Sequence, residues 1–293
     1  MADFQKQKVQ WFPGHMAKTR RQIKEMLPLV DGVVELLDAR VPYSSANPEL
    51  DTLVRGKPRI VLLNKCDVAD PAATKRWIAA FEAQGKTALA VDCRGGKGLS
   101  AFLPTVQQVL KKTIEKNTQR GMAGKPLRLM VVGIPNTGKS SFINRMAGKN
   151  RAKVADKAGV TRQNQWFAVG GGIELLDTPG ILWPKFDDPE VGKRLAFTGA
   201  VKDDVLDIEE LACYLMDYLA AHYADTLTER YKIEVEPGDT GYELLEKAGR
   251  KRGFLMRGAQ VDTERMARVL LDEFRGGKLG RFTLETVEDV QHA

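Results

Sequence analysis

Residues 62–67 read LLNKCD, an apolar run that ends in an Asn-Lys-x-Asp pattern, and side chains of these types can recognise a guanine base. The Asp67 carboxylate can accept hydrogen bonds from guanine N1–H and from the exocyclic amine, whereas adenine presents an acceptor at that place. We expect Asn64 to bind the other edge of the base and to brace a phosphate loop, with the stem of Lys65 over the base plane. Buried polar groups left unpaired cost about 1–3 kcal/mol, so such a site should reject ATP strongly.

The phosphate-binding motif is GIPNTGKS at residues 133–140, which matches G-x-x-x-x-G-K-[ST] between an apolar strand and an amphipathic stretch. Gly133 and Gly138 let backbone N–H groups surround the phosphates at a helix N-terminus. Lys139 is expected to reach the β- and γ-phosphates, and the Ser140 hydroxyl to ligate Mg²⁺. The predicted phosphate-binding residues are Asn136, Thr137, Gly138, Lys139, Ser140, Ser141 and, from the next motif, Gly180.

A third motif, Asp-Thr-Pro-Gly at residues 177–180, follows another predicted strand. D-x-x-G alone is expected about once by chance in a chain of this length, so its place at a strand end beyond the phosphate loop is what makes it significant. Asp177 is expected to hold Mg²⁺ through water, and the Gly180 N–H to meet the γ-phosphate. Thr161 is the candidate switch residue that closes over the same ion, with a plain loop threonine as the alternative.

These motifs stand in a rotated order along the chain. An ordinary GTPase has its guanine-recognition motif after the phosphate loop, whereas here Asn64 precedes Gly133. A helper segment at 92–98 follows a further strand, and its Cys93 backbone N–H is expected to meet the guanine carbonyl. Termini that lie close together on a surface can be joined and the chain reopened elsewhere, so a circular permutation explains the order. The predicted guanine-binding residues are Asn64, Lys65, Cys66, Asp67, Asp92 and Cys93.

Length and composition predict a globular protein of two domains. The 293 residues are 43% apolar and 28% charged, and they show neither a signal peptide nor an apolar run long enough to span a membrane. Three cysteines without metal-type spacing fit reduced thiols, which favours a cytoplasmic protein. The 45 Lys and Arg residues outnumber the 38 Asp and Glu residues, and the net charge of +7 favours a polyanionic partner, although each basic cluster is equally well a solvated face.

Short apolar strands alternate with helical stretches in the first part of the sequence. This alternation predicts an α/β fold with a mostly parallel sheet and helices on both faces, and it places each motif at the carboxyl end of a strand, where such sheets bind ligands. Strands are expected at 30–38, 59–64, 87–92, 127–133 and 172–177, and helices at 71–85 and 99–117. We expect a circularly permuted GTPase domain at 1–185 and a smaller all-helical RNA-binding domain at 186–293, with helices at 208–223, 242–252 and 262–277.

Together with these rotated motifs, the stretches QWFPGHMAK at 10–18, LLDARVPYSSANPEL at 36–50 and TGYELLEKAGRKRG at 240–253 make the chain resemble the circularly permuted GTPases of ribosome assembly. The resemblance covers nearly all of the chain. It implies a GTPase that binds a late precursor of the bacterial large (50S) ribosomal subunit, with its rRNA and ribosomal proteins, and that leaves after hydrolysis. We expect the protein to act as a monomer.

The residues around the γ-phosphate predict an unusual hydrolysis. Ile181 stands where Ras-like enzymes carry the glutamine that orients the attacking water, and an apolar side chain cannot do so. The resemblance points to His15 as the catalytic substitute, either as general base or as water orienter, while a helix cap or an RNA contact is the alternative role. In related GTPases an asparagine at the place of Asn136 ligates K⁺. We therefore expect a low intrinsic rate that K⁺ and ribosomal particles raise.

The basic loop GRKRGFLMRG in the tail is the expected RNA contact, and Phe254 within it is either a stacking surface or part of the core. The candidate RNA-binding residues are Arg250, Lys251, Arg252 and Arg257. Two other classes of function stay open: a GTP-dependent switch acting through a protein effector, and a nucleotide kinase, which would leave Asn64 and Asp67 unexplained. Cutting the chain after Phe186 is expected to leave nucleotide binding largely intact.

Overall fold

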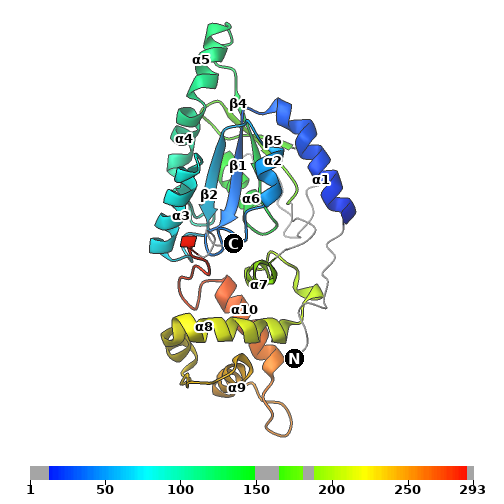
Figure 1. The fold of residues 1–293 in the computed structure, drawn as a ribbon, viewed down its shortest axis with the longest axis vertical. Coiled ribbons are helices and arrows are strands. Elements are labelled where there is room, and N and C mark those ends of the chain that lie inside the picture. Colours follow the sequence, from blue (N-terminus) through cyan, green and yellow to red (C-terminus); the bar gives the residue numbers. More distant parts are fainter. Residues whose placement is uncertain (1–12, 149–164, 181–187, 289–293) are drawn as a thin grey trace. The chain divides into compact units, whose positions relative to one another are not determined.

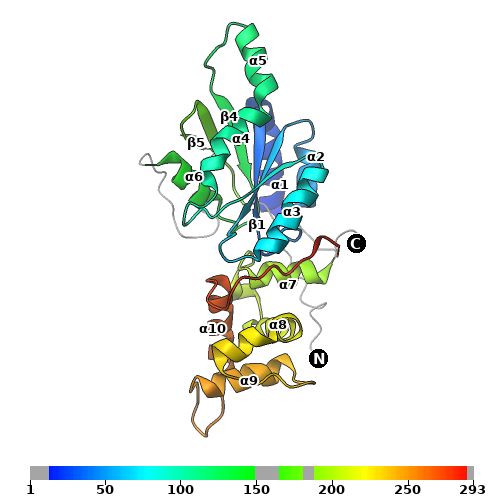
Figure 2. The ribbon, with the colours of Figure 1, turned by 90° about the vertical axis from the view of Figure 1, so that its left-hand side faces the viewer.

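The computed structural model describes residues 13–148, 165–180 and 188–288, with side chains from residue 19 onward. The chain forms two compact units, Met1–Asp188 together with Phe282–Ala293, and Pro189–Arg281. The first is an α/β unit and the second is a helical unit (Figures 1 and 2).

A single sheet in the order β3-β2-β1-β4-β6-β5 forms the centre of the α/β unit. Its strands are β1 (Gly32–Asp38), β2 (Arg59–Asn64), β3 (Thr87–Ala90), β4 (Leu127–Val132), β5 (Gln165–Ala168) and β6 (Ile173–Asp177). All neighbouring pairs are parallel except β5 with β6. The mostly parallel sheet predicted from the sequence is therefore confirmed, and β5 is an antiparallel edge strand that was not predicted.

Helices cover both faces of the sheet, and this is why its central strands are nearly continuous apolar runs. On one face, Phe102 and Val106 of α4 and Phe142 of α6 pack against alternate strand residues such as Leu36 and Leu62. The opposite face is covered by α1, α2 and α3. The helices of this unit are α1 (Pro13–Met26), α2 (Pro48–Leu53), α3 (Pro71–Ala83), α4 (Phe102–Val109), α5 (Lys111–Gln119) and α6 (Lys139–Ala147).

The helix expected over 99–117 is divided in the structure. A 3₁₀ turn at Leu99–Ala101 leads into α4, and the backbone leaves the helical conformation at Leu110 before α5 begins. Leu110 is 1% exposed and is the last residue of this stretch in the core, whereas α5 has no buried residue. The helix is therefore interrupted at the last residue that is buried in the core. Figure 1 shows that α5 extends beyond the sheet.

The helical unit contains α7 (Pro189–Phe197), α8 (Ile208–Tyr231), α9 (Gly241–Lys251) and α10 (Thr263–Arg275). Each of the last three begins at a side-chain cap, provided by Asp207, by Thr240 in a capping box with Glu243, and by Asp262. The three predicted helices are confirmed. However, α8 continues past the expected end through a kink at Tyr223 because its apolar positions continue to Leu227 and Tyr231.

The segment from Phe282 onward belongs to the α/β unit, although the sequence placed all of 186–293 in the helical domain. The reason is that Phe282, Thr283 and Leu284 are buried and hydrogen-bonded to loops that follow β1 and β2. The expectation that a cut after Phe186 would leave nucleotide binding intact loses its basis, since such a cut also removes this segment. No helix in the described part of the chain is long and apolar enough to cross a membrane.

Candidate functional site

The nucleotide-binding motifs follow neighbouring parallel strands of the sheet and therefore begin at the same end of it. From β1 the chain proceeds outward through β2 to β3, and from β4 it proceeds to β6 in the opposite direction. The boundary between β1 and β4 is thus a topological switch point, where the loops beyond the strand ends leave space for a ligand. The loops that begin after Asp38, Asn64 and Val132 all start at this edge.

The phosphate loop closes on itself through its own side chains. Lys139 Nζ donates to Gly133 O at 3.0 Å and to Ile134 O at 2.7 Å, and Thr137 Oγ1 donates to Ile134 O at 2.9 Å. Gly133 has φ +153°, and a Cβ there would lie 2.5 Å from Leu36 O. These contacts hold the loop in a turn at the N-terminus of α6, which is the arrangement that binds phosphate groups.

Burial gives Lys139 an unusual protonation equilibrium. Removal of its ammonium from water lowers its pKa to about 8, and the nearby Asp177 carboxylate opposes this shift. A phosphate group beside the ammonium would favour the charged form and raise the pKa again. We therefore expect binding of a nucleotide to be linked to proton uptake at this side chain.

Asp177 has the properties expected of a residue that faces a cation. Burial raises the pKa of its carboxyl group, with the Lys139 ammonium acting in the opposite direction. Its Oδ1 atom is buried and has no hydrogen-bond partner among the described residues. Oxygen donors of this kind suit Mg²⁺, so Asp177 and the Ser140 hydroxyl fit the ion that a GTPase uses. Within the described chain no cluster of three or more His, Cys, Asp or Glu side chains forms another metal site.

Gly180 lies directly against the phosphate loop. A Cβ at this position would lie 3.0 Å from Pro135 N and 3.1 Å from Lys139 Nζ. A side chain would therefore separate this backbone from the loop, and glycine keeps the approach that a contact from its N–H to the γ-phosphate requires.

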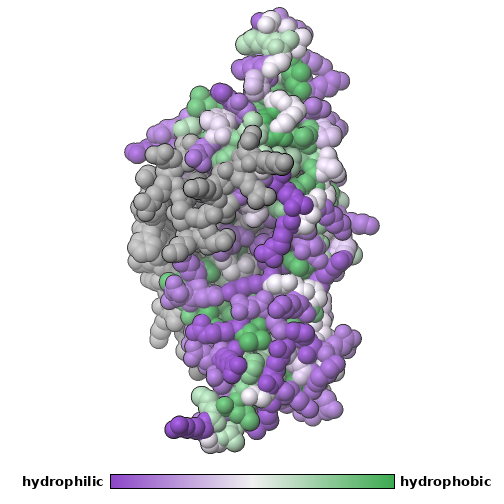
Figure 3. Space-filling model, turned by 180° about the vertical axis from the view of Figure 1, so that it is seen from behind, coloured by the Kyte–Doolittle hydropathy of each residue, from purple (hydrophilic) through white to green (hydrophobic). Residues whose placement is uncertain are grey.

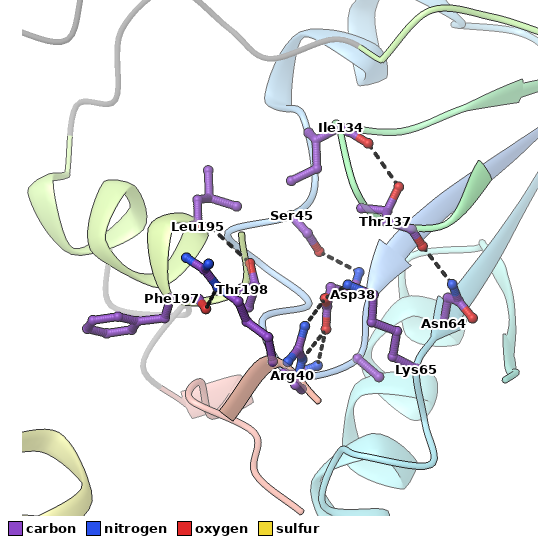
Figure 4. Close-up of polar contacts among 12 residues, drawn as sticks. Asp38, Arg40, Ser45, Asn64, Lys65, Ile134, Thr137, Leu195, Phe197 and Thr198 are labelled. Atoms are coloured by element: carbon purple, nitrogen blue, oxygen red, sulfur yellow. Dashed lines mark hydrogen bonds and ion pairs between the residues drawn. The ribbon is translucent and has the colours of Figure 1, made fainter. Parts of the chain in front are cut away.

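Asn64 joins the guanine-recognition motif to two other loops, and Figure 4 shows its contact with Thr137 of the phosphate loop. Its Nδ2 donates to Thr137 O at 2.6 Å, and its Oδ1 accepts from Cys93 N at 2.9 Å. A Cβ on Gly138 would lie 2.3 Å from Asn64 Nδ2, so the second glycine of the phosphate loop makes room for this amide. These contacts attach Asn64 to the phosphate loop, as expected, while its expected contact with the edge of the guanine base stays a prediction.

The helper segment has a different hydrogen-bond arrangement from the one expected. Its Cys93 N–H, expected at the guanine carbonyl, donates to Asn64 because that buried amide oxygen needs a donor. Asp92 Oδ1 accepts from Arg94 N and Gly95 N, each at 2.8 Å, and so stabilises the turn. Burial raises the pKa of the Cys93 thiol to about 12, so this thiol is protonated at neutral pH.

Asp67 and Lys65 of the guanine-recognition motif differ in their surroundings. Asp67 is exposed, and its carboxylate makes no hydrogen bond to the described residues, so it is available to a ligand. Lys65 has φ +64°, and its Nζ lies 2.8 Å from Asp38 Oδ2, which fixes the direction of its stem. Cys66 is buried between these two residues, and its N–H donates to Val91 O.

Asp38 and Arg40 form a buried ion pair that the sequence motifs did not reveal. Arg40 donates to both oxygens of Asp38 at 2.9 and 2.8 Å and is 1% exposed. Burial alone would raise the pKa of Asp38, but the charges of Arg40 and Lys65 prevail and lower it. Ser45 Oγ accepts from Asp38 N. The sequence feature that could have indicated this ion pair is an acidic residue at the end of β1. That strand lies beside β2, which ends at Asn64.

Several predicted residues are only partly described. His15 lies within α1, but its side chain is outside the described residues, and so are Thr161 and Ile181. Asn136 is exposed and has φ +61° at the outer turn of the phosphate loop. Ser140 is half-buried and Ser141 is exposed at the start of α6.

The candidate RNA-binding residues differ in their surroundings. Lys251 and Arg257 are exposed, and Arg250 pairs with Glu246 at 2.9 Å on the same helix. Arg252, in contrast, donates to the buried Glu273 of α10 at 3.0 Å and lies over the Tyr231 ring. These contacts give Arg252 a structural role, since it packs α9 against α10.

Replacing Asn64 with Ala should lower the affinity for GDP about 10- to 100-fold, because Thr137 O and Cys93 N each lose a buried partner. Titration with a fluorescent GDP analogue measures the effect. Asn117→Ala, on the surface helix α5, is the matched control and should bind as wild type. Equal affinities for the two variants would contradict the bracing role of Asn64.

The affinity for GDP should also depend on pH through Lys139, whose pKa is about 8 in the free protein. Its charged form is fully present below that value, so affinity should fall as pH rises above it, by at most about tenfold per unit. Calorimetry at pH 9 in two buffers of different ionisation enthalpy should show net proton uptake. This uptake should disappear in Lys139→Met, and its absence in the wild type would refute the linkage.

Comparison with known proteins adds independent information to this geometry. The family model described as 50S ribosome-binding GTPase matches residues 128–247, a stretch that begins in β4. The ribosome biogenesis GTPase A of Bacillus cereus is 47% identical over 281 residues, which are 96% of this chain and 95% of that protein.

Two solved structures of YlqF from Thermotoga maritima, one bound to GDP and one to GNP, are similar to this chain, and both are 30% identical to it. The GDP-bound structure has a TM-score of 0.65 and the GNP-bound structure one of 0.63. The alignments cover 92% of this chain and 100% and 98% of those chains, respectively. With the rotated nucleotide motifs assembled at one edge of the sheet, the chain belongs to the ribosome biogenesis GTPase A family and is a GTP hydrolase with a role in ribosome assembly.

Proposed function

We propose that this GTPase drives a late step in assembly of the 50S subunit, binds rRNA in the precursor particle and leaves after hydrolysis. The observation that supports this most is the connection of the nucleotide site to the helical unit. The chain passes from the D-x-x-G motif, which ends at Gly180, into that unit at Pro189. A change at the γ-phosphate can thus reach an RNA-binding unit through a short stretch of chain. The names of the matching family and relatives agree with a ribosomal partner.

The proposed nucleotide contacts follow the geometry of the switch point. Asp67 recognises the guanine N1–H and amine, and the Lys65 stem covers the base. The backbone at 136–141 and the Lys139 ammonium bind the phosphates. Ser140, Asp177 and Thr161 hold Mg²⁺, with Asp177 acting through water; the buried, unpaired Oδ1 of Asp177 supports this assignment.

The catalytic proposal concerns His15 and Asn136. His15 orients or deprotonates the attacking water, since Ile181 cannot do so. Asn136 ligates K⁺ beside the β- and γ-phosphates; its exposure and its left-handed conformation at the outer turn of the phosphate loop support this role. We expect the particle to place His15 and the switch residues for hydrolysis, and the intrinsic rate without it to be low.

The RNA contact is proposed for the last residues of α9 and the loop that follows it. Arg250, Lys251 and Arg257 are exposed there, and Figure 3 shows hydrophilic residues over most of the visible face of this unit. A second basic surface lies on and after α5, where Glu115 is the sole acidic residue between positions 111 and 125. Its basic residues are Lys111, Lys112, Lys116, Arg120 and Lys125.

One observation favours the alternative of a protein effector. Leu255 and Met256 in the same loop are 52% and 50% exposed, and hydrophobic colour is seen at this tip in Figure 3. Binding to the particle through these side chains would depend little on salt, whereas phosphate contacts depend on it steeply. We propose a cytoplasmic monomer that uses the phosphate contacts.

The proposed catalysis is tested by GTPase rates with and without large-subunit particles. Particles should raise the wild-type rate at least about tenfold in K⁺ and much less in Na⁺, because K⁺ is the ion proposed to bind at Asn136. His15→Ala should lose the stimulation and keep its GDP affinity. His222→Ala, an exposed histidine on α8, is the control and should behave as wild type. Equal rates in Na⁺ and K⁺ would exclude the potassium role, and no gain from particles would exclude the main proposal.

The RNA contact is tested by charge reversal at the end of α9 and in the loop that follows it. Lys251→Glu and Arg257→Glu should each weaken binding to precursor particles and reduce the slope of log affinity against log salt by about 1. Lys278→Glu makes the same charge change elsewhere on the helical unit and should leave the slope unchanged. Wild-type slopes in both loop variants would favour the effector alternative.

A further inference from the structure

The four residues Phe282–Glu285 cross the edge of the sheet where the guanine-recognition loops begin. All four are between 2% and 6% exposed, although none belongs to a helix or strand. Trp77 Nε1 on α3 donates to Glu285 O at 3.1 Å and fixes the end of this segment. Figure 2 shows the segment in red, leading from α10 to the end marked C.

The segment is bonded to the loop that contains Asp67. Phe282 N donates to Val68 O at 3.1 Å, and Asp70 N donates to Thr283 Oγ1 at 3.2 Å. These two hydrogen bonds hold the backbone at Val68 and Asp70, directly after the guanine-recognition motif. The position of the exposed Asp67 carboxylate therefore depends on backbone that the segment holds.

It is bonded equally to the loop after β1. Leu284 N donates to Arg40 O at 2.8 Å, and Thr283 Oγ1 donates to Ala39 O at 3.2 Å. The Thr283 hydroxyl thus accepts from one loop and donates to the other. A single side chain connects the backbone that follows Asp38 with the backbone that follows Asp67.

Glu285 makes the largest number of the hydrogen bonds between this segment and the loops. Its carboxylate accepts from Tyr43 N at 2.7 Å and Ser44 N at 3.1 Å, and it also accepts from the Ser44 hydroxyl. The neighbouring Ser45 accepts from Asp38 N, and Asp38 binds the Lys65 ammonium. Glu285 is thereby linked, through the turn at 43–45, to the ion pair that directs the Lys65 stem.

We propose that Thr283 and Glu285 are positioning residues of the guanine-binding site, which set the separation of Asp67 and Lys65 without touching the base. A buried carboxylate that accepts three N–H and O–H donors is replaced poorly by an amide, since one of its atoms then becomes a donor facing donors. Loss of these hydrogen bonds would let the loops that follow β1 and β2 move slightly apart. Hydrogen bonds to guanine would then weaken, because their strength depends steeply on distance and angle. This inference rests on the proposed role of Asp67 in recognising guanine.

The test compares binding of GDP and of inosine diphosphate (IDP), which lacks the exocyclic amine that Asp67 is proposed to recognise. Glu285→Gln should lower GDP affinity about tenfold and IDP affinity less, so that the ratio of the two affinities falls several-fold. A merely destabilised protein would lose active fraction for both nucleotides and keep the ratio. Glu288→Gln changes an exposed glutamate shortly after this segment; it is the matched control and should keep both affinities.

Thr283→Val provides a second variant, because it removes the bridging hydroxyl with little change of shape and serves if Glu285→Gln does not fold. A wild-type GDP/IDP ratio in either folded variant overturns the proposal. Asp67→Asn separates the two possible failures. If Asp67→Asn changes the ratio and the segment variants do not, the positioning role is wrong and guanine recognition stands. If Asp67→Asn also keeps the wild-type ratio, the assignment of Asp67 itself fails, and with it the positioning role.

Discussion

The buried amide of Asn64 is the interaction on which the nucleotide site depends. Its nitrogen and oxygen bind backbone groups of the phosphate loop and of the helper segment, while its own chain continues toward Asp67. An amide with both ends satisfied in a buried place has one favourable orientation, since any other leaves a donor and an acceptor unpaired. Gly138 is needed for the same reason, because a side chain there would displace the amide. The guanine-recognition motif, the phosphate loop and the helper segment are therefore held together by a single side chain.

Local patterns were sufficient to predict much of the fold. The apolar runs of β1, β2 and β4 and the glycine spacing of the phosphate loop are properties of neighbouring residues, and each was found where expected. The break at Leu110 was not predicted, because it depends on where the chain leaves the core and not on helix propensity. The antiparallel strand β5 was missed for a similar reason, since its stability comes from pairing with β6.

The site was predictable only where one motif contains both the residue and its role. Asn64 and Lys139 belong to such motifs. The contacts of Cys93 and Arg252 depend on distant groups, namely the Asn64 amide and the Glu273 carboxylate of another helix, and no local pattern reveals them. Asp38 and Glu285 were missed because neither interaction leaves a periodic signal. The first is an ion pair at the end of a strand, and the second is a carboxylate that binds a turn far away in sequence.

The attachment of Glu285 to Ser44 has a consequence for biosynthesis, because the two residues are 241 positions apart. Contacts of such long sequence separation form late, since the intervening chain must first be ordered or at least present. A nascent chain can pair β1, β2 and β4 soon after they leave the ribosome, but the loops after β1 and β2 wait for their last partner until all of α7 to α10 has been translated. The loops proposed to recognise guanine therefore gain their full set of backbone contacts only after the helical unit has been synthesised.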